Sequence, residues 1–198
     1  MTALILASAS ASRQRMLLAA GISFQAVPAP VDEAAIKQSM RAQRASAHQI
    51  AEVLAELKAV RISERFPDAL VLGADQTLEL GHEILDKPGS LEDAAGQLRR
   101  LSGGIHALPT AAVMAEHGAP VWRKIVSPKV TFRPLSEAFI AAYLGQMGER
   151  ALNCVGGCEV EGLGAQMITK IEGDFFAILG LPLLDVLDYL RLRGIMPS

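Results

Sequence analysis

The segment ALILASASASRQR, residues 3–15, decides the fold class of this chain. Its apolar start predicts a short buried strand over residues 3–7, and the polar residues that follow predict a turn and then a helix that closes at Gly21. A strand that passes through a polar turn into a helix is a building unit of α/β proteins. We therefore expect an α/β fold.

The rest of the chain adds strands and helices in mixed order. The predicted strands cover residues 23–27, 69–75, 105–116 and 121–133, and residues 77–85 read as a hairpin with Gly81 in its turn. The predicted helices cover residues 33–44, 47–65, 90–102, 135–147 and 181–194. This order predicts a mixed sheet flanked by helices. Because no repeat, low-complexity tract or long linker interrupts the chain, residues 1–198 are expected to form a single domain.

Two of these helices carry more specific expectations. The C-terminal helix is expected to point four leucines inward, namely Leu183, Leu184, Leu187 and Leu190. In the helix over residues 47–65, Lys58 follows Leu54 by four positions and is expected to leave the apolar side. Taken alone, Lys58 would then be an edge lysine that keeps its charge in solvent.

The composition limits the classes of protein to consider. Hydrophobic residues make up 51% of the chain, and 19 Lys and Arg against 21 Asp and Glu give a net charge of −2, so no overall field attracts nucleic acid or membrane. Aromatic residues are only 5%, which disfavours an RNA-binding module. MTALILASAS lacks the basic start of a signal peptide, and no run of about 20 apolar residues follows, so we expect a cytoplasmic protein.

The cysteines and histidines give little sign of a metal centre. Cys154 and Cys158 lie four apart, without C-x-x-C spacing or a second Cys/His pair, and are interpreted as reduced thiols near a turn. The four histidines show no ligand spacing. Zinc is therefore not indicated.

Polar side chains follow three of the predicted strands. Ser8, Ser10 and Arg13 come after the first strand, Glu33 after the second and Asp75 after the third. The free N–H groups at a helix start bind anions. Carboxylates at strand exits suit Mg²⁺, which takes one or two carboxylates and completes its shell with substrate phosphates. Together these residues indicate a site for a metal-bound polyphosphate.

Each of these residues also has a purely structural interpretation. Ser8 and Ser10 suit helix caps, and Arg13 suits a solvated first turn. An acidic residue such as Glu33 is common at a helix start. Asp75 suits a turn at the end of a strand, and Lys87, in DKPGS, suits a position before a proline turn. Spacing alone leaves both interpretations open.

A series of ordered segments resembles the motifs of the Maf nucleotide pyrophosphatases. These segments are LILASASASR, PAPVDE, LAELKA, LGADQTLEL, EILDKPGS, RLSGGIHALPT, FRPLS, VGGCEVEGLGA and KIEGDFFAILGLPL. The resemblance implies an elongated mixed β-sheet flanked by helices, as in inosine triphosphate pyrophosphatases, with two lobes around a cleft. It further implies a homodimer, and an enzyme that hydrolyses nucleoside triphosphates to monophosphate and pyrophosphate and so cleans the nucleotide pool.

The resemblance also implies roles for individual residues. Ser8, Ser10 and Arg13 match the phosphate-binding start of the family. Lys58 and Lys87 match two lysines that contact the triphosphate. Glu33 matches a catalytic or metal-binding glutamate, and Asp75 matches the proposed general base. A divalent cation, Mg²⁺ or Mn²⁺, would be held by Glu33 and Asp75.

Three positions are associated with base choice in the family and correspond to Ser12, Gln76 and Glu161. The pyrimidine subfamily has Arg, Thr and Gln there, and the 7-methyl-GTP subfamily has Trp, Gln and Glu. Gln76 and Glu161 therefore match the second subfamily, whereas Ser12 lacks the stacking tryptophan. A carboxylate can accept both donors of a guanine edge. The preferred base stays open between 7-methylguanosine, another modified purine and a pyrimidine.

Two further points concern the start of the chain and the competing class of function. Ala11, Ser12 and Gln14 depart from the S-x-S-P-R-R pattern of the family, and Arg15 could supply the missing cation. The alternative to an enzyme is a catalytically weak nucleotide-binding regulator of septum formation, the process from which the family takes its name. The presence of Glu33 and Asp75 argues against that alternative.

Overall fold

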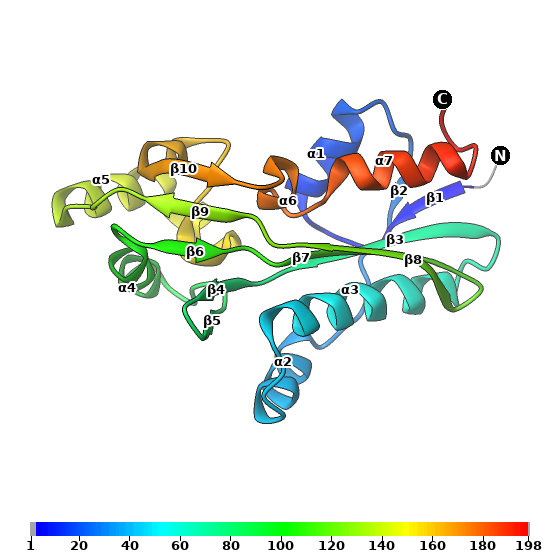
Figure 1. Ribbon diagram of the computed structural model, residues 1–198, viewed down its shortest axis with the longest axis horizontal. Helices are drawn as coiled ribbons and strands as arrows, with labels where there is room; N and C mark the ends of the chain where they lie inside the picture. Colours follow the sequence, from blue (N-terminus) through cyan, green and yellow to red (C-terminus); the bar gives the residue numbers. More distant parts are fainter. Residues whose placement is uncertain (1–2, 198) are drawn as a thin grey trace.

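The computed structural model describes residues 3–197 and contains two five-stranded β-sheets flanked by helices (Figure 1). The first sheet has the order β2-β1-β3-β7-β8, with β1 at Ala3–Leu6, β2 at Gln25–Ala26, β3 at Ala69–Gln76, β7 at Thr110–Glu116 and β8 at Ala119–Val126. The second has the order β10-β9-β6-β4-β5, with β4 at Leu78–Leu80, β5 at Glu83–Leu85, β6 at Ile105–Ala107, β9 at Lys129–Phe132 and β10 at Ile168–Glu172.

The strand directions confirm the mixed α/β class. In the first sheet β1 runs parallel to β2 and β3, whereas β7 runs antiparallel to β3 and β8. The second sheet is antiparallel throughout the described pairs. The two sheets follow one another along the long axis of the molecule (Figure 1).

Prolines separate the two sheets. Each of the predicted strands 105–116 and 121–133 is interrupted, at residues 108–109 and 127–128. Pro109 and Pro128 lack an N–H and so cannot donate to a sheet ladder. Their carbonyls instead accept from Thr77 N (2.9 Å) and Leu108 N (2.9 Å). The chain also breaks beside Pro109 at Thr77, between β3 and β4, so three neighbouring strands are interrupted at the same level and the expected elongated sheet is divided there.

Helices cover both sheets. Their bounds are α1 Ala11–Ala19, α2 Glu33–Ala42, α3 Ala47–Ser63, α4 Leu91–Leu101, α5 Glu137–Met147, α6 Phe175–Ile178 and α7 Leu183–Leu192. On the first sheet, α1 and α7 cover one face and α3 covers the other (Figure 1). On the second sheet, α4 and α5 pack with the short 3₁₀ segments η1 Gly148–Asn153, η2 Val155–Gly157 and η3 Leu163–Met167.

One expected core position is wrong. Leu184 is 58% exposed, and Val186 is buried on the inner face of α7 instead. The helix begins at Leu183, so the helical period places Val186 and Leu190 beneath it and turns Leu184 outward. Leu187 packs, half-buried, against the same core.

The backbones of α3 and β3 lie in direct contact at Gly73. A Cβ at Gly73 would lie 2.2 Å from the carbonyl oxygen of Ala55 and 2.7 Å from the backbone nitrogen of Ala59. Both alanines are fully buried. Side chains alternate along a strand, so Asp75 lies on the same face of β3 as Gly73 and faces α3. The small residues therefore allow α3 to approach the face that carries Asp75.

We expect Gly73→Ala to destabilise the fold by about 3 kcal/mol, because the added methyl group must push α3 away from β3. Gly96→Ala is the matched control, since nothing lies within 4 Å of a Cβ at Gly96 in α4. This control should be stabilised by up to about 1 kcal/mol, because alanine is the better helix former. Urea unfolding of both variants measures the difference, and equal stabilities would contradict the close contact.

Candidate active site

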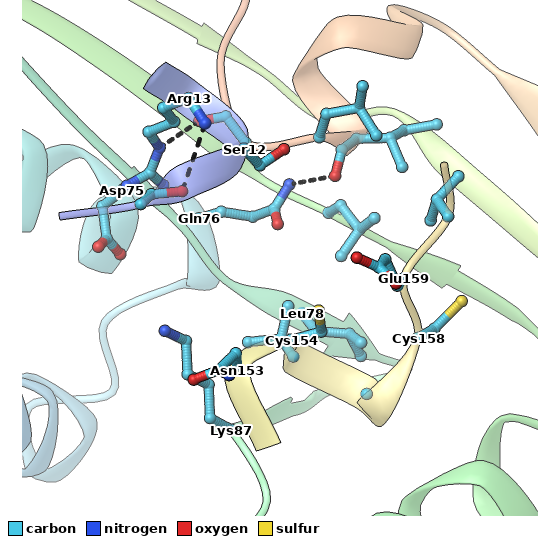
Figure 2. Close-up of a pocket in the computed structure, with 18 of the residues that line it drawn as sticks. Ser12, Arg13, Asp75, Gln76, Leu78, Lys87, Asn153, Cys154, Cys158 and Glu159 are labelled. Atoms are coloured by element: carbon cyan, nitrogen blue, oxygen red, sulfur yellow. Dashed lines mark hydrogen bonds between the residues drawn. The ribbon is translucent and has the colours of Figure 1, made fainter. Parts of the chain in front are cut away.

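One cavity of about 700 Å³ brings together every site residue that the sequence analysis singled out. It opens where β1 and β3 end, close to the start of the second sheet, and its lining includes part of the 153–161 segment (Figure 2). The ten residues are Ser8, Ser10, Ser12, Arg13, Glu33, Lys58, Asp75, Gln76, Lys87 and Glu161.

Lys58 lies between the two carboxylates. Its Nζ is 2.6 Å from Oδ1 of Asp75 and 2.6 Å from Oε1 of Glu33. The side chains of Lys58 and Asp75 are only 9% and 7% exposed, whereas that of Glu33 is 44% exposed. The expectation that Lys58 leaves the apolar side of its helix is wrong. α3 holds Lys58 on the face packed against β3, where Asp75 neutralises its charge.

The cations of the cavity act on Glu33. Burial by itself would raise the pKa of Glu33, but the hydrogen bond from Lys58 and the charges of Lys58, Lys37 and Lys87 together lower it. Glu33 is therefore held as a carboxylate. Asp75 uses only one oxygen for Lys58, and its Oδ2 is buried without a hydrogen-bond partner among the described residues. That oxygen is left as an acceptor.

The start of α1 fixes Arg13 inside the protein. Ser10 caps the helix by accepting from Arg13 N (3.4 Å), and the hydroxyl oxygen of Ser8 accepts from Ser10 N (3.2 Å) and Arg13 Nη1 (3.2 Å). Arg13 Nε donates to the carbonyl of Gly180 (2.7 Å). Burial lowers the pKa of Arg13, and the charges of Asp75 and Glu33 act in the opposite direction. Arg13 is thus a buried cation of the cavity and not a solvated first-turn residue.

Two further lysines face the same end of the cavity. Lys87 is exposed, and its side chain extends across the cavity toward Arg13 and Asp75 (Figure 2). Lys37 on α2 also lines the cavity and lies 3.4 Å from Asp86. The sequence analysis missed Lys37, although its place four residues after Glu33 puts both on one face of a helix.

The amide of Gln76 has a fixed orientation. Its Nε2 donates to the carbonyls of Ala177 (2.7 Å) and Ile178 (3.1 Å) and to the hydroxyl of Thr110 (2.9 Å). Because these partners occupy the NH₂ group, its carbonyl oxygen is the free end. Figure 2 shows that oxygen turned toward the interior of the cavity.

Glu161 is held through one of its two oxygens. Its Oε1 accepts from Ser12 Oγ (3.2 Å) and from Arg15 Nη2 (2.9 Å). Arg15 therefore pairs with Glu161 and does not join the serines at the start of α1, so the idea that it replaces the missing cation there is wrong. The second oxygen of Glu161 is left as a single acceptor.

The 150–161 segment adds residues that the sequence analysis missed. Glu159 lines the cavity and is paired with Arg150. Its place two residues before Glu161, in CEVEG, was the available signal. Cys154 and Cys158 are free thiols, as expected, and also line the cavity. Burial raises the pKa of both, so they stay protonated.

His106 is a further missed residue of the cavity. It is 4% exposed, and burial lowers its pKa to about 4, so the ring is neutral at neutral pH. Its ring lies edge-to-face against Phe132 at 4.8 Å between centroids.

The described residues hold no group of three or more His, Cys, Asp or Glu side chains placed to bind a metal. Glu33 and Asp75 are nevertheless two carboxylates on one cavity, and Asp75 Oδ2 has no partner in the protein. Two carboxylates fit Mg²⁺ when phosphates supply the other ligands. Over residues 3–197, no helix has the length and apolar character needed to cross a bilayer.

Comparisons with known proteins identify the family of this chain. The family model described as Maf-like protein matches residues 3–193. A nucleoside triphosphate pyrophosphatase of Hyphomonas neptunium is 50% identical over 196 residues, which cover 99% of this chain and 98% of the relative. A 7-methyl-GTP pyrophosphatase of Rhizobium etli is 46% identical over 191 residues and 96% of each chain. A nucleoside triphosphate pyrophosphatase of Caulobacter vibrioides is 46% identical over 98% of this chain and 97% of the relative.

Replacing Lys58 should destabilise the protein, because Lys58→Met leaves Asp75 buried without its counter-charge. We expect a loss of about 3 kcal/mol, at the lower end for a broken buried pair because Glu33 is half-exposed. Lys87→Met, at an exposed lysine on the same cavity, should change the stability by less than about 0.5 kcal/mol. Urea unfolding at pH 8 compares the two variants, and similar small losses would show that Lys58 does not neutralise a buried carboxylate.

Proposed function

Because this chain belongs to the Maf family, we propose that it acts as a nucleoside triphosphate pyrophosphatase in this cavity, with Glu33, Lys58, Asp75 and Lys87 as its catalytic residues. The observation that carries the proposal is the set of charges gathered there. Four cations surround Glu33 and Asp75, although the whole chain has a net charge of −2, and the other two cations of the lining, Arg15 and Arg150, are paired with Glu161 and Glu159. The four are Arg13, Lys37, Lys58 and Lys87.

The phosphates lie at the end of the cavity formed by the start of α1. Ser8 and Ser10 supply hydroxyls there, and the free N–H groups of the helix attract an anion. Arg13 and Lys87 contact the phosphates and neutralise charge as it develops on the departing pyrophosphate. Such electrostatic stabilisation is usually the largest contribution to catalysis.

Asp75 orients the attacking water. Its Oδ1 is engaged by Lys58, and its unpartnered Oδ2 accepts a hydrogen bond from the water and takes its proton. The water oxygen bonds to the α-phosphorus, and the bond from that phosphorus to the bridging oxygen breaks. Pyrophosphate leaves with the electron pair, and the nucleoside monophosphate remains.

A divalent cation, Mg²⁺ or Mn²⁺, belongs to this proposal. The carboxylates of Glu33 and Asp75 would hold it. When bound, the cation polarises the phosphates and makes the phosphorus easier to attack. The donor chemistry of the two carboxylates supports this assignment.

The base lies at the other end of the cavity, where Ser12, Gln76 and Glu161 choose it. Gln76 presents its carbonyl oxygen, and Glu161 presents the one oxygen that Arg15 and Ser12 leave free. Two separate acceptors suit the N1–H and N2–H donors of a guanine edge, which 7-methylguanine shares. We therefore propose that the preferred base is a guanine-type purine, whose N1–H and N2–H groups donate to Gln76 and Glu161.

Two parts of the proposal concern the setting of the enzyme. A homodimer follows from the family resemblance, and exposed apolar side chains on α1 and α7, at Leu18 and Leu184, offer surface for it. Light scattering of the purified chain tests this assembly. A cytoplasmic location is consistent with the two free cysteines, because reducing compartments keep thiols unpaired.

The purified protein should release pyrophosphate and monophosphate from a triphosphate in the presence of Mg²⁺ or Mn²⁺. Lys87→Ala should lower kcat/KM at least tenfold, which corresponds to about 1.4 kcal/mol of transition-state stabilisation. The native protein and the variant are assayed with a panel of canonical and methylated triphosphates, and the products are identified. Release of orthophosphate alone would argue against the proposed cleavage. An unchanged kcat/KM in Lys87→Ala would show that Lys87 takes no part in catalysis.

Glu161→Gln should lower kcat/KM selectively for substrates that carry a guanine base. Arg15 and Ser12 will keep the amide oxygen on their side, so the NH₂ group takes the place of the acceptor that faces the cavity. A guanine donor then meets a donor, which costs about 1 to 3 kcal/mol, or roughly 5- to 150-fold in kcat/KM. In Glu161→Gln, kcat/KM for uridine triphosphate should change by less than about threefold. Asp75→Asn should instead lower kcat/KM for all substrates by a similar factor. If Glu161→Gln lowered kcat/KM by the same factor for every base, Glu161 would not be a base-recognition residue.

A further inference from the structure

The base end of the cavity has an apolar floor with one polar side chain in it. Leu78, Leu108, Val130 and Phe132, from the second sheet and its junction with the first, line the cavity together with His106. His106 is the register partner of Val130, and cross-strand partners carry their side chains on the same face of a sheet. His106 therefore replaces an apolar residue in a surface otherwise suited to the flat face of a base.

The two ring nitrogens of His106 have different surroundings. Nδ1 is buried and has no hydrogen-bond partner among the described residues. Because Nδ1 is enclosed, a ligand in the cavity does not reach it, and the nitrogen left to meet a ligand is Nε2. The ring packs against Phe132, but that contact needs no nitrogen. A phenylalanine or leucine would serve packing alone.

The state of the ring follows from this environment. Burial lowers the pKa of His106 to about 4, so the ring is neutral at neutral pH and carries one N–H. Because Nδ1 is enclosed without an acceptor, the proton is more stable on Nε2, the nitrogen on the other edge of the ring. His106 thus offers a hydrogen-bond donor at Nε2.

We propose that His106 is a base-recognition residue, whose Nε2–H donates to a ring nitrogen or carbonyl oxygen of a purine lying on the apolar floor. The assignment rests on the proposed function, because it requires a nucleotide in this cavity. Gln76 and His106 supply two hydrogen-bonding positions along one lining, with Leu78 also on it. A purine carries hydrogen-bonding groups on both rings and can meet both positions. A pyrimidine is smaller and carries them on one ring, so we expect it to meet Gln76 without reaching His106.

The test compares His106→Leu and His106→Gln with the native protein, using guanosine and uridine triphosphates. His106→Leu should lower kcat/KM for the guanosine substrate at least tenfold and for the uridine substrate less than threefold. His106→Gln should keep kcat/KM for guanosine within about threefold of native, because its amide NH₂ reaches the position of Nε2. His82→Leu, at an exposed histidine in the β4–β5 turn, is the control and should leave both values unchanged.

Thermal unfolding separates recognition from a structural role. His106→Leu should have a Tm equal to or above that of the native protein, since it removes an unpartnered buried atom. If His106→Leu lowered kcat/KM for both triphosphates by the same factor, with or without a lower Tm, the proposal would be overturned. An unchanged ratio between the two substrates would overturn it as well.

A measurement on the native protein covers the case in which the variants do not fold. The side-chain nitrogen signals of His106 should shift in NMR spectra when guanosine monophosphate is added, and they should not shift with pyrophosphate. Signals that guanosine monophosphate leaves unmoved at saturation would refute the contact. If the native protein releases no pyrophosphate from any triphosphate, the proposed activity fails, whereas the NMR shift still decides whether His106 meets a base.

Discussion

The contact between the backbones of α3 and β3 at Gly73 is the constraint on which the cavity depends. No side chain separates the two elements there, so the carbonyl of Ala55 lies where a Cβ would be. Lys58 follows Ala55 by about one helical turn, and Asp75 follows Gly73 on the same face of the strand. One close contact therefore sets both ends of the 2.6 Å pair between Lys58 and Asp75.

The secondary structure could be predicted from sequence, because local patterns determine it. Apolar runs gave the strands, and serine caps and terminal glycines gave the helices, so most predicted elements agree with the structure. The break between the sheets could not be predicted. It depends on Pro109 and Pro128 reaching the same level of neighbouring strands, which requires knowledge of register. Leu184 was misplaced because adjacent leucines cannot both lie on one narrow face of a helix, and the packing that buries Leu183, Val186 and Leu190 turns Leu184 outward.

The sequence was enough to predict which residues line the candidate site, but not which hydrogen-bond partners those residues have. Strand ends and the family resemblance supplied the residues. Which atoms remain free was decided by partners far along the chain, such as the carbonyl of Ala177 for Gln76 and Arg15 for Glu161. These contacts fix whether a side chain offers a donor or an acceptor. Residue identity alone leaves that open, and it led to the earlier picture of a carboxylate that accepts through both oxygens.

The charges of the cavity bear on how it can hold a polyphosphate. A triphosphate carries roughly four negative charges near neutral pH. Together with Glu33 and Asp75 it would exceed the four positive charges of Arg13, Lys37, Lys58 and Lys87 by about two. Lys37 is also shared with Asp86, which widens the difference. One divalent cation would balance it, which supports the proposal that the paired carboxylates, which would otherwise repel the substrate, bind it together with a metal ion.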